Sequence, residues 1–349
     1  AVKDIALEKV KLIREVCKEL DKDLPIIGMG GISTRDDIDA MFEAGANIVG
    51  IGTALTGLNT LEIKQFFYNH DKRPGPLCKI DDDIMKFKPL TLEKVDKKAN
   101  DLIIQHFKED FNCKPGQFCF LWIPGQMEKP FAAAITSPAT FAIRVMGPFT
   151  TKLSELIPGD KIMIRGPYGN GFTVKDDKSL HYHLIGGGTG IAPLLLLANE
   201  LSKKGIPKDQ IHVFLGGRNL DQIYFVDEFD KVAHTHISTD DGSLGFKGFV
   251  TELLKDELEK NKERKTYSYI CGPEIMMKKA FDIAIEYPHE EVECSIEKYM
   301  KCGVGICGIC SMDGMRTCVD GTVFGEKFLS QSRCFGKSHR KKTGEIEYF

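Results

Sequence analysis

The sequence has no long hydrophobic run and no excess of positive charge. Its longest apolar stretches, such as residues 191–198, fall well short of the ~20 residues that a membrane-spanning helix needs. Lys and Arg (47) are balanced by Asp and Glu (50), so nothing in the composition attracts nucleic acid. No signal peptide opens the chain. We therefore expect a cytoplasmic protein that binds neither membranes nor nucleic acids.

Motifs that would indicate a histidine metal site or a disulfide framework are also missing. The nine histidines form neither H-x-x-x-H nor HExxH. His181 and His183 alternate along a strand-like run, where we expect structural or solvent-facing side chains rather than metal ligands. The eleven cysteines occur without secretory features, which favours free thiols or metal ligands over disulfides. A length of 349 residues predicts two or three domains.

Residues 1–72 have the pattern of an α/β unit. Apolar residues at helical spacing open the segment and predict a helix with one buried stripe. Short apolar runs ending in glycine follow at 24–31 and 47–55, and Ser33 with Asp36 indicates a capping box between them. This order favours parallel strands. The predicted stripe comprises Ala6, Val10, Ile13, Cys17 and Leu20.

The rest of the chain changes character three times. Residues 73–87 are rich in Pro, Gly and charge and are typical of a linker. Residues 88–176 contain short β-like runs between Pro and Gly turns, which predict an antiparallel barrel. Strand and helix patterns alternate over 177–292, which indicates a second α/β unit. Residues 293–349 are rich in Cys and Gly with little periodicity, so something other than a hydrophobic core organises them.

Four cysteines near the C-terminus have the spacing of a metal centre. Cys302, Cys307, Cys310 and Cys318 form C-x4-C-x2-C-x7-C. Four thiolates can hold zinc or an iron–sulfur cluster. Zinc ribbons usually pair two C-x2-C units, whereas C-x4-C-x2-C followed by a more distant Cys is the plant-type 2Fe-2S arrangement. The spacing therefore predicts a 2Fe-2S cluster, and a zinc-stabilised loop is the alternative.

Two glycine-containing turns in the second α/β unit are candidates for dinucleotide binding. LIGGGTGIAPL (184–194) follows a strand-like run and opens a helix-like one, where backbone N–H groups can receive a pyrophosphate. Alone, such a stretch is as well explained by a plain tight turn. YICGPEIMMKKA (269–280) supplies a second strand-to-helix turn in the same unit, which favours the binding site.

Several motifs in register carry a family resemblance. Residues ~85–349 resemble the ferredoxin reductase superfamily, and within it the electron-transfer subunit of NAD-linked dihydroorotate dehydrogenase. The resemblance implies a multidomain fold of an antiparallel FAD-binding β-barrel, an NAD-binding α/β domain and a C-terminal 2Fe-2S domain. The motifs are PGQF (115–118), IRVMGPFTTKL (143–153), PGDKIMIRGPYGNGF (158–172), GGGTGIAPL (186–194), CGPEIMMKKA (271–280), SIEKYMKCGVGICGIC (295–310) and TCVDGTVF (317–324).

The resemblance also implies which residues bind each cofactor. The flavin of FAD would lie against Lys129, Pro130, Phe131, Ala132, Ala142, Ile143, Arg144, Phe149 and Thr150. NAD would lie against Gly186, Gly187, Gly188, Thr189, Gly190, Cys271, Gly272 and Pro273. The cluster would be held by the four cysteines named above.

The chain departs from the family pattern at the flavin. The family usually has Arg-Pro-x-Ser/Thr where this chain has Lys129 to Ala132. Lys129 keeps a positive charge but lacks the bidentate fork of arginine. Ala132 lacks the hydroxyl expected near the flavin ring, so either a hydrogen bond is lost or a neighbour such as Thr136 or Ser137 supplies it.

Residues 1–72 resemble the last quarter of the catalytic subunit of the same enzyme family, an FMN-carrying TIM barrel. In such barrels the final strands end in turns that bind a phosphate. By this resemblance Gly30, Gly31, Gly52 and Thr53 would donate N–H groups to the FMN phosphate, and simple loop closure is the alternative.

Two strands cannot close an eight-stranded barrel, so this segment must complete something larger. The remaining strands would come either from an upstream part of the same polypeptide or from a separate catalytic chain, and we expect a hetero- or homo-oligomer. The family's dihydroorotate-oxidising residues belong to the missing part, so no catalytic residue is assigned here. FMN is expected only where that part is present.

The sequence leaves alternatives to this function open. A similar FAD and 2Fe-2S reductase could serve a hydrogenase or sulfite reductase partner, although the barrel segment argues against it. A zinc-stabilised binding protein without redox activity is a third possibility. The choice between NAD and NADP is also open, because Arg218 could meet a 2′-phosphate whereas Asp227 and Glu228 favour NAD.

Overall fold

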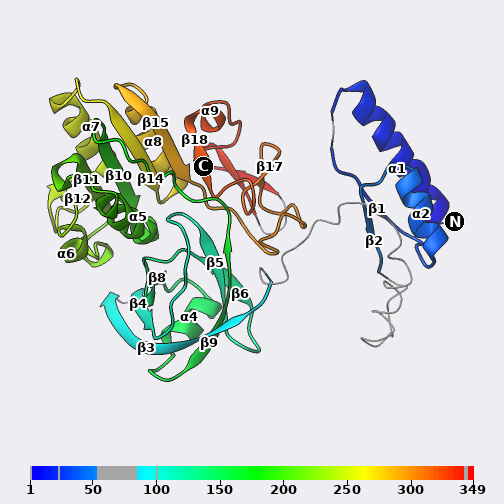
Figure 1. Ribbon diagram of the computed structural model, residues 1–349, viewed down its shortest axis with the longest axis horizontal. Coiled ribbons are helices and arrows are strands. Elements are labelled where there is room, and N and C mark those ends of the chain that lie inside the picture. The colour runs from blue at the N-terminus through cyan, green and yellow to red at the C-terminus, as the bar shows by residue number, and fades with distance from the viewer. Residues whose placement is uncertain (1, 23, 53–84, 100, 342–344) are drawn as a thin grey trace. The chain divides into compact units, whose positions relative to one another are not determined.

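A computed structural model of the chain describes residues 2–22, 24–52, 85–99, 101–341 and 345–349. The chain divides into two compact units, Ala1–Lys79 and Ile80–Phe349 (Figure 1). Within the described ranges, no helix combines the length and apolar character needed to cross a membrane.

The first unit is a small α/β arrangement. Its elements are α1 (Val2–Glu19), β1 (Ile27–Met29), α2 (Arg35–Glu43) and β2 (Ile48–Gly50). The two strands pair in parallel, with Ile27 opposite Ile48, as the sequence predicted. The sequence also favours a helix after the second apolar run, up to about residue 70, and this helix, like most of the predicted linker, lies outside the described residues.

Two local predictions for this unit were wrong. Val10 and Cys17 are buried, but Ile13 and Leu20 are 49% and 64% exposed, so the stripe on α1 is only partly covered. The capping box of α2 uses Thr34 and Asp37, one residue later than expected: the N–H of Thr34 donates to Asp37 Oδ2 at 2.8 Å, and the N–H of Asp37 donates to Thr34 Oγ1.

The second unit begins with an antiparallel sheet of seven strands in the order β6-β5-β9-β3-β4-β8-β7. Figure 1 shows these strands curling around a shared core, which contains Leu92, Phe107, Phe141 and Ile162. The β-like runs of the sequence match β3, β4, β5, β8 and β9, whereas β6, β7 and α4 were not expected. These runs are LTLEKV (90–95), LIIQHF (102–107), GQFCFLWIP (116–124), TFAIRVM (140–146) and DKIMIRGP (160–167). The bounds are β3 (Lys88–Ala99), β4 (Leu102–Phe107), β5 (Phe118–Trp122), β6 (Glu128–Phe131), β7 (Ile135–Thr136), β8 (Ala139–Arg144), α4 (Pro148–Ser154) and β9 (Lys161–Tyr168).

A second sheet of seven strands follows, in the order β13-β12-β11-β10-β14-β15-β18. Strands β10 to β15 pair in parallel. The chain order reverses between β10 and β14, because β11 and β12 lie on one side of β10 and β14 lies on the other. The bounds are β10 (His181–Gly187), α5 (Ile191–Lys203), β11 (Ile211–Gly217), α6 (Val226–Phe229), β12 (His234–Thr239), β13 (Phe246–Lys247), α7 (Val250–Lys260), β14 (Thr266–Cys271), α8 (Glu274–Ala284) and β15 (His289–Ser295), with the short 3-10 turns η2 (Gly188–Gly190), η3 (Lys208–Gln210) and η4 (Leu220–Gln222).

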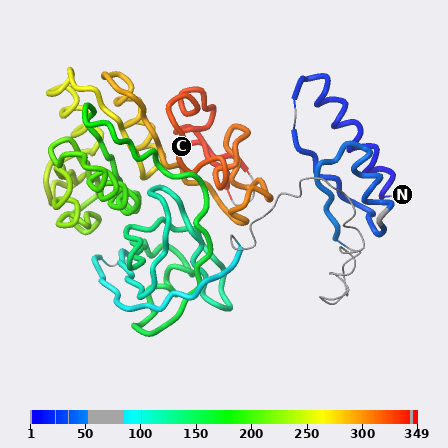
Figure 2. Tube along the Cα trace, viewed as in Figure 1, coloured from blue at the N-terminus to red at the C-terminus, as the bar shows by residue number. Residues whose placement is uncertain are grey.

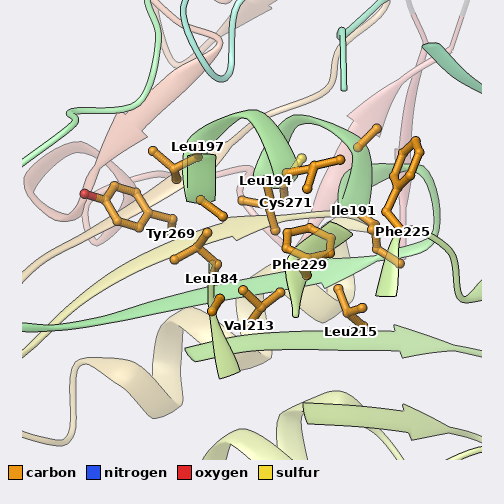
Figure 3. Packing of buried hydrophobic residues seen from close by; sticks show 14 of the residues in the cluster. Leu184, Ile191, Leu194, Leu197, Val213, Leu215, Phe225, Phe229, Tyr269 and Cys271 are labelled. Carbon is orange, nitrogen blue, oxygen red and sulfur yellow. The ribbon is translucent and has the colours of Figure 1, made fainter. Parts of the chain in front are cut away.

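Helices cover both faces of this sheet. Leu194 and Leu197 of α5 pack on Leu184 of β10 and Val213 of β11, as Figure 3 shows. On the opposite face, α7 and α8 pack against the same strands. Full burial of an aliphatic side chain stabilises the fold by roughly 1.5–3 kcal/mol. The buried leucines of α5 therefore fix the position of this helix, which begins directly after the glycine turn.

The C-terminal segment is attached to the α/β sheet. Strand β18 pairs antiparallel with β15 at the sheet edge, with Cys294 opposite Phe324. Figure 2 shows this segment in orange and red beside the yellow strands and helices of the α/β domain. Its elements are β16 (Ser311–Met312), β17 (Met315–Arg316), β18 (Val323–Gly325), α9 (Glu326–Leu329), β19 (Ser338–Arg340) and β20 (Ile346–Tyr348).

Histidines gather on one face of the α/β sheet, at the end where its strands begin. His183 lies opposite His212, and His212 lies opposite His234 on the next strand. His212 Nδ1 and His236 Nε2 are 3.2 Å apart. Burial, with the charges of neighbouring histidines, lowers the pKa of His212 to about 4, and burial also lowers the pKa of His183. His183 and His212 are therefore neutral at neutral pH.

We expect this cluster to destabilise the fold in mild acid. The pKa of His212 lies below its unfolded value of about 6.5, so its stabilising contribution is present above that pH and is lost as the pH falls. From about pH 7.5 to about pH 5.5, His212 alone should lower the free energy of unfolding by about 1.4 kcal/mol. Urea denaturation at both values, compared with His212→Gln, measures this term. An equal pH dependence in the two proteins would contradict it.

Candidate functional site

A narrow cleft of about 330 Å³ lies where the chain order of the α/β sheet reverses. Its walls come from the turn after β10 (Gly187–Gly190), the turn after β14 (Cys271–Pro273) and the barrel strands β6 and β8. In open α/β sheets, ligands bind at the carboxyl ends of the strands at such a reversal. The cleft is therefore placed where a dinucleotide would meet the barrel.

Close backbone contact explains the glycines of this cleft. A Cβ on Gly190 would lie 2.3 Å from the carbonyl oxygen of Cys271, and a Cβ on Gly187 would lie 2.6 Å from Met276 Sδ. Gly188 has a φ of +55°, which favours glycine. The two turns can therefore approach each other only because position 190 carries no side chain, whereas position 188 requires glycine for its backbone conformation.

Cys271 lies at the end of β14 and lines the cleft while being almost fully buried. Burial raises the pKa of its thiol to about 12, so it stays protonated at neutral pH. A neutral thiol packs as a small apolar group with a weak donor. Both interpretations of this residue, contact with a ligand and simple packing, are compatible with its position.

A wider cleft of about 760 Å³ shares residues with the narrow one, including Pro130, Phe131 and Arg144. It is lined by Lys129 and by the turn Gly147–Thr150 at the start of α4. Thr150 Oγ1 accepts hydrogen bonds from the N–H groups of Met146 and Gly147, which fixes this turn. The wide and narrow clefts therefore adjoin each other at these shared residues.

Most predicted flavin and nicotinamide residues line one of these clefts, but two do not. Ile143 is fully buried in the barrel core. Gly186 faces α5, because a Cβ there would lie 3.0 Å from Leu194. Ala132 lines the narrow cleft, and among the described lining residues neither Thr136 nor Ser137 appears as a substitute for its missing hydroxyl.

Sequence reasoning missed the residues that follow β15. Ser295 lines the narrow cleft, and Glu297 and Lys298 line both clefts. Lys298 Nζ lies 2.7 Å from Glu274 Oε2, and both side chains are about nine-tenths buried. Burial raises the pKa of Glu297. The sequence motif SIEKYM (295–300) contains Ser295, Glu297 and Lys298, but only the cysteines that follow it were assigned a role.

The four cysteines of the C-terminal motif form two pairs. The N–H of Cys307 donates to Cys302 Sγ at 3.4 Å, and the thiol of Cys318 donates to Cys310. Burial opposes ionisation of Cys302, but N–H donors from Cys307, Val304 and Ile306 lower its pKa to about 7. The hydrogen bond from the Cys318 thiol lowers the pKa of Cys310 to about 6, although burial acts to raise it. The same bond raises the pKa of Cys318.

Paired thiols are the donor set that a centre of two metal ions would use. Within the described ranges, no three His, Cys, Asp or Glu side chains are arranged to hold a single metal ion. Two thiolates on each of two irons would use both pairs. The N–H of Gly305 donates to Cys318 Sγ at 3.3 Å, and such N–H donors to the sulfurs are typical of iron–sulfur sites. The donor set therefore fits a 2Fe-2S cluster.

The cysteine motif packs directly on the barrel. Cys310 and Cys318 are buried together with Phe118 and Phe120 of β5 and Tyr168 of β9. Cys307 is exposed, and the neighbouring Ile306 is 56% exposed. One side of the motif thus faces the barrel, and the other faces solvent.

The glycines predicted for a phosphate lie at one edge of the first unit. Gly30 and Gly31 follow β1 and Gly52 follows β2, so the parallel pairing brings these turns to the same edge. Gly30 and Gly31 have φ values of +111° and +66°, and a Cβ on Gly31 would lie 2.7 Å from the N atom of Lys3. Thr53, the fourth predicted residue, lies outside the described residues.

Comparison with known proteins gives consistent matches. Residues 184–282 match the family of oxidoreductase NAD-binding domains, and residues 1–65 match the dihydroorotate dehydrogenase family. The chain is 46% identical over 243 residues to the "Probable dihydroorotate dehydrogenase B (NAD(+)), electron transfer subunit" of Methanocaldococcus jannaschii, covering 69% of this chain and 90% of that protein. It is 39% identical over 244 residues to the protein of the same name from Thermococcus kodakarensis, covering 70% and 98%.

Solved structures show the same fold. An NADH-dependent reduced ferredoxin-NADP oxidoreductase superposes with a TM-score of 0.59 at 29% identity, covering 68% of this chain and 88% of that one. A ferredoxin NADP+ reductase from Neisseria gonorrhoeae, solved with bound FAD and NADP, superposes with a TM-score of 0.50 at 17% identity, covering 58% and 92%. The predicted ferredoxin reductase-like β and α/β domains are thereby confirmed.

Proposed function

This chain belongs to the family of dihydroorotate dehydrogenase B electron transfer subunits, and from that premise we propose that it passes electrons between NAD(H) and an FMN-carrying dihydroorotate dehydrogenase barrel, through FAD and a 2Fe-2S cluster, in pyrimidine biosynthesis. It is an oxidoreductase with a catalytic subunit as its partner. One observation carries the proposal: Phe118 of barrel strand β5 both lines the narrow cleft and packs against the paired-cysteine motif.

The wide cleft is proposed to hold FAD and the narrow one the nicotinamide of NAD. A flavin dinucleotide is suited by positive charge and N–H groups, which come from Lys129, Arg144 and the Gly147–Thr150 turn. The glycine-rich turn Gly187–Gly190 leaves room for the nicotinamide. FAD supplies the chemistry that converts two-electron exchange with NAD(H) into one-electron exchange with the cluster. The apolar wall made by Pro130 and Phe131 keeps water from the reacting rings.

The cysteine pairs are proposed to hold the cluster, with Cys302 and Cys307 on one iron and Cys310 and Cys318 on the other. Because Cys310 and Cys318 are packed on the barrel and Cys307 is exposed, this site has one side toward the flavin strands and one side available to a partner. A docked partner on the exposed side would receive electrons with little intervening protein.

The first unit is proposed to be the last part of the FMN barrel, with Gly30, Gly31 and Gly52 at the FMN phosphate. Ile27 and Met29 of β1 are 47% and 63% exposed, although parallel strands are normally covered on both faces. Such a pair needs further strands and helices. The rest of the barrel would belong either to the same polypeptide or to another subunit.

A related reductase function with a different partner is the second candidate. The 29% identity to an NADH-dependent reduced ferredoxin-NADP oxidoreductase favours it. The match of residues 1–65 to the dihydroorotate dehydrogenase family favours the dihydroorotate route. NAD is proposed rather than NADP, since the helix α6, which follows β11 in the chain, carries the acidic residues Asp227 and Glu228 in its first turn.

Anaerobic purification followed by NADH addition tests the proposal. We expect bound flavin, iron and labile sulfide, bleaching of the flavin near ~450 nm, and an electron paramagnetic resonance signal from the reduced cluster. Dihydroorotate should reduce neither centre unless the missing part of the barrel is supplied. A colourless protein with stoichiometric zinc and without flavin would contradict the proposal.

A further inference from the structure

Arg165 of β9 carries a charge into the boundary between the barrel and the cysteine motif. Its side chain is only 3% exposed, although arginine stays ionised in proteins. A buried charge is tolerated only when it is paired and hydrogen-bonded. Glu128 of β6 provides the pairing, since it accepts bonds from Arg165 Nε at 2.7 Å and from Nη2 in a bidentate arrangement.

The other N–H groups of Arg165 bind the cysteine motif and a neighbouring phenol. Nη1 donates to Tyr168 Oη at 2.8 Å and to the carbonyl of Cys302 at 3.0 Å, and Nη2 donates to the carbonyl of Lys301 at 3.3 Å. A guanidinium has five N–H groups, and all five are therefore engaged. The Cζ atom lies 4.1 Å from the ring centroid of Phe120, so one face of the guanidinium is covered as well.

These contacts connect two segments that are assigned to different cofactors. Glu128 directly precedes Lys129, the first proposed flavin residue, on β6. Cys302 is the first proposed cluster ligand. The adjoining Gly303 has no room for a side chain, because its Cβ would lie 2.8 Å from Phe120 and 3.5 Å from Arg165 Nη1. The backbone around Cys302 is thus held against the barrel at the point where Arg165 reaches it.

We propose that Arg165 is a positioning residue for electron transfer, which fixes the start of the cluster-binding loop relative to the flavin-binding strand β6. This inference rests on the proposed function, since it concerns the path between the two proposed centres. Electron transfer slows steeply when its path lengthens, so a loosened connection should slow the exchange without removing either centre. The positive charge near Cys302 should also make the cluster easier to reduce, and Glu128 should offset part of that effect.

Two substitutions separate geometry from charge. Arg165→Lys keeps the charge but cannot form the bidentate pair or span both carbonyls. We expect cluster reduction after mixing with NADH to slow roughly tenfold or more, with flavin and iron content retained.

Glu128→Gln keeps the bonds from Arg165 to the loop but removes the negative charge. We expect it to raise the reduction potential of the cluster. Arg333→Lys, at an exposed arginine of the C-terminal segment, is the matched control and should behave as the wild type.

The experiment uses the anaerobic full-length protein with both centres loaded. One NADH, oxidised to NAD⁺ with release of one proton, supplies electrons for two clusters, and rapid-freeze resonance spectra follow their reduction while redox titration gives the potential. Slower reduction in Arg165→Lys together with a raised potential in Glu128→Gln supports the inference. A wild-type rate in Arg165→Lys, or an unchanged potential in Glu128→Gln, overturns it. A wild-type protein without cluster or flavin would instead defeat the proposed function.

Discussion

Replacing Cys310 with serine is expected to remove the iron–sulfur cluster and to stop electron delivery beyond the flavin. Cys310 is buried against the barrel and paired with Cys318, and a hydroxyl is a poor substitute for a thiolate toward iron. Loss of a group that only hydrogen-bonds to a metal ligand costs about 10–100-fold in metal affinity or activity. Loss of a ligand itself should therefore reduce electron transfer to the barrel by roughly 100-fold or more. Reduction of a small dye by NADH should persist, because it needs only the flavin and the clefts. Iron and sulfide analysis with both assays measures the effect.

Cys334→Ser provides the matched control. Cys334 lies in the same segment but outside the predicted spacing, and its thiol donates to Asp313 Oδ2 at 3.2 Å, a bond that a serine hydroxyl can also make. It should keep a full cluster. Equal iron loss in both variants would show that the segment responds to any lost thiol, and this would contradict the assignment of Cys310 as a ligand.

The sequence predicted those parts of the fold where a local pattern decides the structure. Strands β10 and β14 contain aromatic and aliphatic residues and end at glycine turns, and α5 begins with the apolar run of residues 191–198. Strand β12 was missed because HTHIST has no apolar alternation; its place in the sheet comes from pairing with β11 and from the histidine face. Strand β6 and helix α4 were missed because each is short and contains proline.

The same distinction applies to the site. The turns at Gly187–Gly190 and Cys271–Pro273 could be predicted, since parallel strands bring their carboxyl ends to one edge. Glu297 and Lys298 could not, because they enter the clefts only when β15 pairs beside β14 and the chain leaves the sheet there. Arg165 shows the same limit: its importance depends on Glu128 and Cys302, which are far from it in the sequence.

Replacing Gly190 with alanine should weaken the use of NADH far more than its size suggests. Gly190 has a φ of −65°, so alanine causes no backbone strain there. The added Cβ would instead lie 2.3 Å from the carbonyl oxygen of Cys271 and 2.6 Å from the N atom of Gly272. No backbone tolerates such contacts, so the Cys271–Pro273 turn must move outward. A misplacement of about 1 Å can lower an enzyme's rate 10²-fold. We expect a rise of that order in the KM for NADH, measured by steady-state dye reduction.

Gly188→Ala separates this effect from the general loss of a glycine. Gly188 lies two residues earlier in the same turn, where an added Cβ meets nothing within 4 Å, but its φ of +55° makes alanine strained by about 1–2 kcal/mol. If contact between the two turns controls nicotinamide binding, Gly190→Ala should raise KM more than Gly188→Ala while leaving flavin and iron content unchanged in both. The reverse order would mean that backbone conformation at Gly188, rather than the approach of the β10 turn to the β14 turn, shapes the narrow cleft.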